Sequence, residues 1–369
     1  MDRRIALAAR ISLAGAVGRV AAQPRRPRVV FLNPGEPVER GKGPQWRMAA
    51  RFMASAAAGF GMELEVLYAE RDHLLMMQQA EEVAGRRRPP DYVVMVNEKQ
   101  SAPQMMQALA RTPAKLLLIH NDLTAEQRQE FGHERGRMRQ WIGTVTTDEV
   151  HAHARLAAEL CRQLGDREPR VVGITGDRGT PVSLERAQGF SDYVTRVRRG
   201  QVLQLAFSDW SRADAEDKAR VLLARYPETN IIWAANDSMA LGALRAVKAL
   251  GAPVLVGGTG AWPDALASLA EGGLAATLGS HFFIGAWAMV LLNDYHQGHD
   301  FAAAGGAAQK LDYMVVVNRD NAASYDRSVY QRTEAFDFRA YSKAPKTSKT
   351  RPPGTGRYDF NLAPLLRHP

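Results

Sequence analysis

Polar and aromatic side chains recur directly after the short apolar runs of this 369-residue chain, where they could bind a small molecule. The set comprises Asn33, Glu36, Glu70, Asn97, Glu98, Asn121 and Asp122, and then Asp177, Arg178, Asp209, Trp210, Asn236, Asp237, Thr259 and Trp262. Amides and carboxylates bridge neighbouring hydroxyls, and indole rings cover the C–H face of a sugar, so these types suit a hydroxyl-rich ligand. The alternative for each Asn, Asp or Thr is a helix N-cap. Caps do not account for tryptophan recurring beside carboxylates, which favours binding.

The sequence carries no motif of catalysis or of metal binding. It has no GxxxxGK[ST] loop, GxSxG elbow, HExxH or paired CxxC, and the segment Gly173–Gly179, spaced GxxGxxG, is more typical of a tight turn than of a phosphate cradle. His151 and His153 open a helix on different sides of it, which suits no metal site. We predict no catalytic residue, no metal and no cofactor. An enzyme of unrecognised type stays the alternative, because a fold does not fix a function.

The elements that must position these side chains alternate along the chain. Apolar runs at 29–32, 64–68, 92–96 and 116–119 alternate with helical patterns at 45–60, 73–84 and 102–111. A second series has runs at 171–174, 203–207, 231–233 and 254–256, with helical patterns at 149–163, 183–197, 213–225 and 239–250. Short apolar strands separated by helices predict parallel sheets of βαβ units, and two series predict two similar α/β lobes. Ligands of such sheets bind beyond the carboxyl ends of the strands, where the polar residues lie.

The formal net charge of +9 belongs to the two ends of the chain. Seven arginines against Asp2 lie in residues 1–28, and six lysines or arginines against Asp359 lie in residues 343–369. The body between them is close to neutral, so the sequence does not indicate a basic body that binds nucleic acid. The single cysteine, Cys161, excludes an intrachain disulfide and lies among apolar residues, as a core thiol does.

The N-terminus has the layout of an export signal. Arg3 and Arg4 precede a mostly apolar stretch from Ile5 to Val17, and Val20-Ala21-Ala22 resembles a cleavage site, so we predict a signal peptide at 1–22 and a periplasmic protein. A ragged N-terminal helix or a misassigned start is the alternative. No other segment has the 18 or more apolar residues of a membrane span. Residues 343–369, rich in Lys, Pro and Gly, predict a basic extended tail.

Several segments resemble the type I periplasmic binding proteins, which share their ligand domain with the lac-repressor family. Trp233–Leu244 resembles the turn whose Asn reaches the sugar, Glu185–Phe190 the motif whose Arg contacts the ligand, and Ser208–Ser211 the site of a stacking aromatic. Val254–Gly260 and Gly273–Thr277 match the next two units, and the resemblance covers about residues 28–320. By resemblance, Asn236, Arg186 and Trp210 contact the ligand.

This sequence departs from the family pattern at three places. Thr259 stands where the family usually has Asp, Asn121-Asp122 where an Asp-Arg pair is common, and Gly279–Phe283 where a Gln-containing segment is usual. A ligand held by fewer carboxylates presents fewer hydroxyl pairs than a plain pentose or hexose. These differences are similar to those of the autoinducer-binding receptors of the same superfamily, which report to a membrane sensor.

The resemblance implies two Rossmann-like lobes with parallel sheets joined by a three-strand hinge, which crosses near Thr146, Ser280 and Tyr313. We expect an N-terminal lobe of 24–146 plus 281–313 and a C-terminal lobe of 147–280 plus 314–342. The residues predicted to bind the ligand are Asn33, Glu36, Trp46, Glu98, Asn121, Arg186, Trp210, Asn236, Thr259 and His281.

The function expected from the sequence is capture of a small polar, sugar-like ligand for a membrane ABC permease, by a monomer without a nucleic-acid partner. The alternative is a receptor that signals to a membrane sensor kinase or cyclase. A transcription regulator of the lac-repressor type needs an N-terminal helix-turn-helix domain of about 60 residues, whereas about 27 residues precede the first predicted strand.

Overall fold

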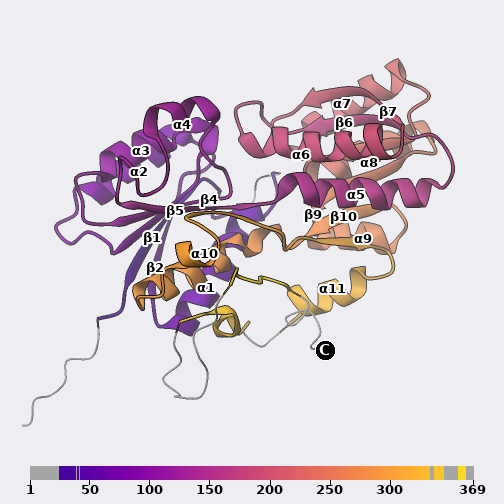
Figure 1. Cartoon of the computed structure of the whole chain (residues 1–369). Helices are drawn as coiled ribbons and strands as arrows, with labels where there is room; N and C mark the ends of the chain where they lie inside the picture. Colours follow the sequence, from indigo (N-terminus) through magenta and orange to yellow (C-terminus); the bar gives the residue numbers. More distant parts are fainter. Residues whose placement is uncertain (1–24, 39, 41, 333–335, 345–355, 363–369) are drawn as a thin grey trace, which may run out of the picture.

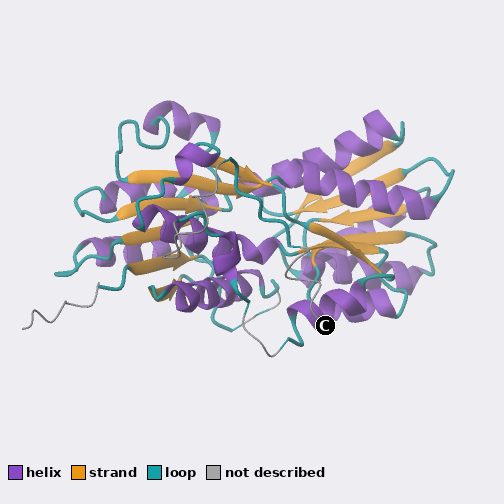
Figure 2. Cartoon of the chain, turned by 60° about the horizontal axis from the view of Figure 1, so that its bottom comes forward, coloured by secondary structure: helices purple, strands orange, loops and turns teal. Residues whose placement is uncertain are grey.

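The computed structural model describes residues 25–38, 40, 42–332, 336–344 and 356–362. They form two α/β lobes side by side, each a six-stranded sheet with helices on both faces (Figures 1 and 2). This confirms the predicted fold class. The predicted signal peptide, residues 1–22, lies outside the described residues.

The sheet of the first lobe is entirely parallel and has the order β11-β5-β4-β3-β1-β2. Its strands are β1 (Arg28–Asn33), β2 (Glu63–Tyr68), β3 (Tyr92–Met95), β4 (Lys115–Ile119), β5 (Trp141–Thr147) and β11 (Ala308–Leu311). Central strands such as β1 read as unbroken apolar runs because both faces are buried. Val29 and Phe31 face one core cluster, whereas Val30 and Leu32 face the other.

The helices of the first lobe supply those two cores. They are α1 (Gln45–Phe60), α2 (His73–Ala84), α3 (Ala102–Leu109), α4 (Ala125–Phe131) and α10 (Ile284–His296). Phe52 of α1 packs with Val29 and Phe31, and Met76 of α2 packs with Val30 and Leu32. The predicted bounds of α1 and α2 are confirmed, whereas β5 and α4 were not predicted. The Gly and three Thr of β5 weaken its apolar signal.

The sheet of the second lobe has the order β12-β10-β9-β8-β6-β7, and only the edge strand β12 is antiparallel to its neighbour. Its strands are β6 (Arg170–Thr175), β7 (Gln201–Phe207), β8 (Ile231–Ala234), β9 (Leu255–Gly260), β10 (Ala276–Gly279) and β12 (Val315–Asn318). Its helices are α5 (Glu149–Leu164), α6 (Pro181–Asp192), α7 (Arg212–Arg225), α8 (Asp237–Leu250), α9 (Pro263–Ala270) and α11 (Ala322–Val329).

The chain passes between the two sheets after β5, after β10 and between β11 and β12 (Figure 1). Tyr313, on the last of these crossings, joins the other two. Its hydroxyl donates to the backbone oxygen of His281 at 2.9 Å and lies 2.9 Å from Thr147 Oγ1. A single side chain therefore holds the three segments of the hinge together.

The C-terminal segment returns to the first lobe. After α11, which packs on α9, the short helix Phe338–Tyr341 contacts α1 and α10. Phe360 stacks on Trp287 with the ring centroids 4.6 Å apart, and the Tyr358 hydroxyl donates to Asp294 Oδ2 at 2.8 Å. The described part of the basic segment thus buries its apolar residues against α10. No helix among the described residues is long and apolar enough to cross a membrane.

Candidate functional site

A cavity of about 70 Å³ lies between the lobes, at the carboxyl ends of both sheets. It is lined from the first lobe by Gly35, Glu36, Lys42, Gly43, Pro44, Gln45, Trp46, Arg47, Arg71, Glu98 and His120. The second lobe and the hinge add Thr180, Val182, Arg186, Trp210, Asn236, Thr259, Trp262 and His281. Because the carboxyl ends of parallel strands share one edge, loops that are distant in sequence meet there.

Three tryptophans form the apolar walls of the cavity. Trp46, in the first turn of α1, meets the ring of His120 edge-on with the centroids 4.8 Å apart. Trp210 lies against Gly176, where a Cβ atom would overlap the indole ring. Trp262 of the second lobe lies against Gly43 of the first, and a Cβ there would overlap it as well. Indoles from both lobes can therefore cover the faces of a flat ligand.

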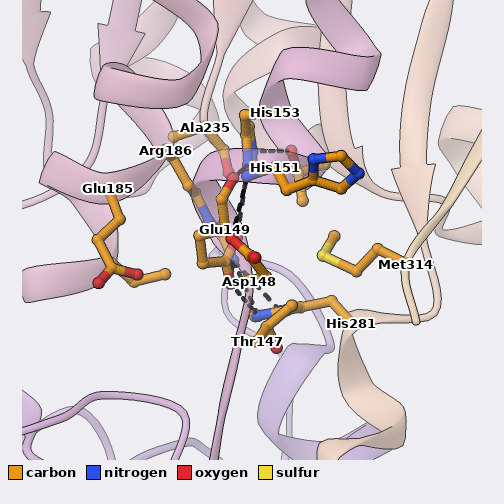
Figure 3. Close-up of polar contacts among 12 residues, drawn as sticks. Thr147, Asp148, Glu149, His151, His153, Glu185, Arg186, Ala235, His281 and Met314 are labelled. Atoms are coloured by element: carbon orange, nitrogen blue, oxygen red, sulfur yellow. Dashed lines mark hydrogen bonds and ion pairs between the residues drawn. The ribbon is translucent and has the colours of Figure 1, made fainter. Parts of the chain in front are cut away.

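A buried charged cluster lies beside these walls, and Figure 3 shows it at the start of α5. Arg186 Nε donates to Glu149 Oε2 at 3.0 Å, and Nη2 donates to Oε1 at 3.2 Å. Arg186 Nη1 also donates to the Ala235 oxygen at 2.6 Å, and His281 Nε2 lies 2.7 Å from Glu149 Oε1. These contacts fix the orientation of the Arg186 side chain, and its guanidinium group lies at the cavity.

The protonation states in this cluster follow from burial and pairing. Burial by itself raises the pKa of Glu149, but the charge of Arg186 and the hydrogen bond from His281 outweigh it and hold the pKa well below its usual range. Burial lowers the pKa of His281, which Glu149 only partly offsets, and burial also lowers the pKa of His120 well below 6.5. Arg186 and Glu149 therefore form an ion pair beside neutral imidazoles, which can donate or accept a hydrogen bond.

A second ion pair borders the cavity from the first lobe. Arg71 Nη2 lies 3.3 Å from Glu98 Oε1, and the side chains are 18% and 5% exposed. Arg71 follows β2 and Glu98 follows β3, so each stands at a strand end. The cavity is thus flanked by one guanidinium–carboxylate pair on each lobe.

Two predicted contacts in the second lobe also have structural partners. Asn236 caps α8, since Oδ1 accepts from the Met239 amide at 2.7 Å, and Nδ2 donates to the Trp210 oxygen at 3.1 Å. Thr259 Oγ1 lies 3.0 Å from His153 Nε2. Asn236 therefore fixes the loop that carries Trp210. The Asn236 oxygen keeps a second lone pair for a ligand.

Most of the residues predicted to bind a ligand line this cavity, namely Glu36, Trp46, Glu98, Arg186, Trp210, Asn236, Thr259 and His281. The structure places the other two outside its lining. Asn33 donates to the Trp46 oxygen and accepts from the Gly35 amide, so it holds the loop after β1. Asn121 Oδ1 accepts from the Val182 amide at 3.3 Å and links the two lobes.

Sequence reasoning missed Arg71, His120 and Glu149. Arg71 follows Glu70 and His120 precedes Asn121, two residues that the strand-end argument did single out, so a wider window at each strand end would have included both. Glu149 follows β5, a strand that was not predicted. Nothing in the sequence indicates that Glu149 is the partner of Arg186.

His120, Glu149 and His281 bring possible metal-ligand atoms within 4.8 Å of one another. The donor set resembles a two-histidine, one-carboxylate site. However, both oxygens of Glu149 already accept from Arg186, and a metal ion there would face a fixed guanidinium charge. The cluster is better suited to holding Arg186 than to holding a cation.

Residues 39–300 match the family model of the periplasmic binding protein domain. The structure of a periplasmic sugar-binding protein from Pseudomonas fluorescens is 33% identical, with a TM-score of 0.78, and the match covers 92% of this chain and 99% of that one. A solute-binding protein from Actinobacillus succinogenes, solved with bound D-allose, shares the fold with a TM-score of 0.70 at 18% identity over 81% of this chain and 100% of that one.

Two curated relatives match part of the chain. The ribose import binding protein RbsB of Haemophilus influenzae is 32% identical over 138 residues, which are 37% of this chain and 46% of the relative. The D-allose-binding periplasmic protein of Escherichia coli is 32% identical over 153 residues, which are 41% and 49%. The chain therefore spans about half the length of the curated relatives that it matches.

Proposed function

The chain belongs to the family of periplasmic binding proteins, and we propose that it captures a small polar, sugar-like ligand between its lobes for a membrane ABC transporter. The observation that carries the proposal is the cavity at the hinge, where Trp46, Trp210 and Trp262 surround polar groups from both lobes. Indoles that cover C–H faces and amide or charged groups that meet hydroxyls are what a sugar requires.

Each lobe has a separate role in this proposal. Trp210 and Trp262 of the second lobe and Trp46 of the first cover the ligand ring, while Arg186, Asn236 and Glu98 are placed to meet its polar edge. A ligand that contacts both lobes stabilises their closed arrangement over an open one, because only the closed state makes both sets of contacts. Closure excludes water and strengthens each polar contact.

We propose delivery of the ligand to a transporter, rather than signalling to a sensor, because of the names of the similar proteins. The similar proteins are named for ribose import and for D-allose binding in the periplasm. Export of this chain to the periplasm, as a monomer, is part of the same proposal. It requires the N-terminal residues to act as the signal that their sequence predicts.

Calorimetric titration of the purified chain with pentoses, hexoses, inositols and their acids tests the binding proposal. One of them should bind with a Kd in the micromolar range or tighter, equivalent to about 8 kcal/mol or more. Trp210→Ala should abolish that binding, whereas Leu250→Ala, at an exposed position, should leave it unchanged. Binding that survives Trp210→Ala would move the site away from this cavity.

Cellular uptake separates transport from sensing. Cells without the gene should lose high-affinity uptake of the labelled ligand, and the protein should be recovered in the periplasmic fraction. A protein that binds the ligand while its deletion leaves uptake intact would contradict the transport role and favour a receptor.

A further inference from the structure

The N-terminus of α1 opens into the cavity without a cap. Its N-cap is Pro44, which makes no side-chain cap bond, and its first turn contains no acidic residue. Pro44, Gln45, Trp46 and Arg47 all line the cavity. The backbone N–H groups of Gln45, Trp46 and Arg47 therefore have no acceptor among the described residues, and the positive end of the helix dipole lies at the cavity.

Three other helices that start near this region are capped by their N-cap side chain. Asp148 accepts from the backbone at the start of α5, Ser211 at the start of α7 and Asn236 at the start of α8. Each of these side chains supplies an acceptor to the helix end.

The N-cap residues of α6 and α9 make no such bond, but the Val182 amide of α6 donates to Asn121 and the Ala265 amide of α9 donates to Asp264. At α1 no side chain among the described residues supplies such an acceptor, which leaves the place open to water or a ligand.

Buried donors of the cavity independently lack an acceptor. Trp262 is 3% exposed, and its Nε1 has no hydrogen-bond partner among the described residues. The same holds for Nε2 of Gln45 and for Nδ1 of His120, which is 7% exposed. The Trp262 and Gln45 nitrogens can only donate. The six-membered ring of Trp262 lies against Gly43 at the lobe boundary, whereas its Nε1 lies against Gly260 of its own lobe, so Gln45 Nε2 is the unpartnered donor that belongs to α1 itself.

The charges around this end of the cavity are mostly positive. Arg71 and Arg186 are neutralised by Glu98 and Glu149, but Lys42 and Arg47 have no acidic partner among the described residues. The one unpaired acid of the described lining is Glu36. The start of α1 therefore combines two unpaired cations, free N–H groups and buried donors, which is the chemistry of an anion site.

We propose that the ligand carries an anionic group, a carboxylate or a phosphate, on a polyhydroxylated skeleton, and that this group binds at the N-terminus of α1 between Lys42, Arg47 and Gln45 Nε2. The inference rests on the proposed function and narrows its ligand to sugar acids or sugar phosphates. The hydroxyl groups occupy the part of the cavity near Arg186 and Asn236.

Titration with matched series tests the class of ligand. Each series holds a neutral sugar, its acid and its phosphate: glucose, glucuronate and glucose 6-phosphate, or ribose, ribonate and ribose 5-phosphate. One acid or one phosphate should bind at least about tenfold tighter than its neutral partner. Its affinity should fall when salt is raised from 50 to 500 mM, as expected for an ion contact. Whether the acid or the phosphate binds identifies the anion.

Substitutions at the start of α1 test its placement. Lys42→Ala and Arg47→Ala should each weaken the anionic ligand about tenfold and change the affinity of its neutral partner less than about threefold. Arg111→Ala, which removes an exposed cation of the same lobe paired with Glu81, should change neither. Gln45→Glu places a competing carboxylate at the helix end, so it should abolish binding of the anion while the melting temperature stays equal or rises.

The possible outcomes separate this inference from the proposed function. A neutral sugar that binds as tightly as its acid and phosphate overturns the anionic ligand and leaves a sugar-binding protein. An anion whose affinity survives Lys42→Ala, Arg47→Ala and Gln45→Glu overturns the placement at α1. If no member of any series binds, both the inference and the proposed function fail.

Discussion

The guanidinium of Arg186 and the carboxylate of Glu149 form a buried ion pair that joins α6 to the start of α5, with Nε 3.0 Å from Oε2. Both side chains are at most 5% exposed. In such a setting each charge depends on the other, because neither can be hydrated.

Glu149→Gln should therefore destabilise the protein by about 3–5 kcal/mol, since it leaves Arg186 buried without a counter-charge. Urea unfolding followed by circular dichroism measures the change. Glu185→Gln is the matched control, because Glu185 pairs with Lys310 at the surface and its loss should cost less than about 1 kcal/mol. Equal effects of the two variants would show that the buried pair is not needed for folding.

Asn236 has two roles that substitution can separate. Asn236→Ala removes the cap of α8 and should lower the stability by about 1 kcal/mol as well as ligand affinity. Asn236→Ser keeps a capping oxygen but loses the amide that donates to Trp210, so the stability should stay near that of the parent while affinity falls about tenfold. Thermal melts measure the stability of each variant and calorimetric titration measures its ligand affinity, so together they separate the capping role from the binding role. If Asn236→Ser bound the ligand as tightly as the parent, the side-chain amide of Asn236 would not contribute to ligand binding.

Gly176 fixes where the ring of Trp210 can lie. Gly176→Ala should displace the indole and weaken ligand binding at least about tenfold, because the new methyl group would overlap the ring. Ligand-induced quenching of tryptophan fluorescence should fall in parallel and be largely absent in Trp210→Ala. Gly59→Ala in α1, where a Cβ meets nothing within 4 Å, is the control and should bind normally. Unchanged quenching in Trp210→Ala would refute the contact.

Tyr313→Phe removes the hydroxyl that links Thr147 to the His281 backbone across the hinge. The expected loss of stability is about 1–3 kcal/mol, since buried partners are left unsatisfied. The radius of gyration of the ligand-free protein, from small-angle scattering, should rise as the lobes open more freely. Tyr226→Phe, which removes a half-buried hydroxyl bonded to Gln204 away from the hinge, should leave the radius unchanged. A Tyr313→Phe protein with the parent's radius would rule out the hydroxyl as a hinge restraint.

Buried histidines make the stability depend on pH. Burial lowers the pKa of His153 to about 3, which Glu149 only partly offsets, and burial lowers the pKa of His120 and His281 as well. These imidazoles stay neutral in the folded chain but take up protons on unfolding below pH 6.5, so the free energy of unfolding should fall as pH drops from 6.5. Each contributes a slope of up to about 1.4 kcal/mol per pH unit.

Asp237 acts in the opposite sense. Burial raises its pKa to about 7, against the hydrogen bonds from Thr277 and Trp262, so its contribution to stability grows as pH falls from 7 towards 4. Urea unfolding at pH 7, 6 and 5 measures the net slope. His153→Asn should flatten it, whereas His133→Asn, at an exposed position, should not. The same slope in both variants would contradict a buried neutral His153.

The sequence by itself determined the features that depend on local patterns. Apolar runs and helical periodicity predicted four strands of each lobe in their order and the bounds of α1 and α2, because burial on a sheet or helix face imposes a period on neighbouring residues. The position of Trp210 after a strand predicted its place at the cavity, since strand ends in parallel sheets share one edge, whereas Arg186 was expected there from the resemblance to the family.

Only the tertiary structure decided which of these polar groups pair with one another. Arg186 meets Glu149 and His281, which are 37 and 95 residues away, and Asn121 is bonded to Val182 rather than placed in the cavity lining. Such pairing depends on how separate loops meet at the hinge and on the loss of water there, neither of which leaves a period in the sequence. The uncapped start of α1 is readable from Pro44 onward, but its place on the cavity beside Trp262 follows only from the packing of one lobe against the other.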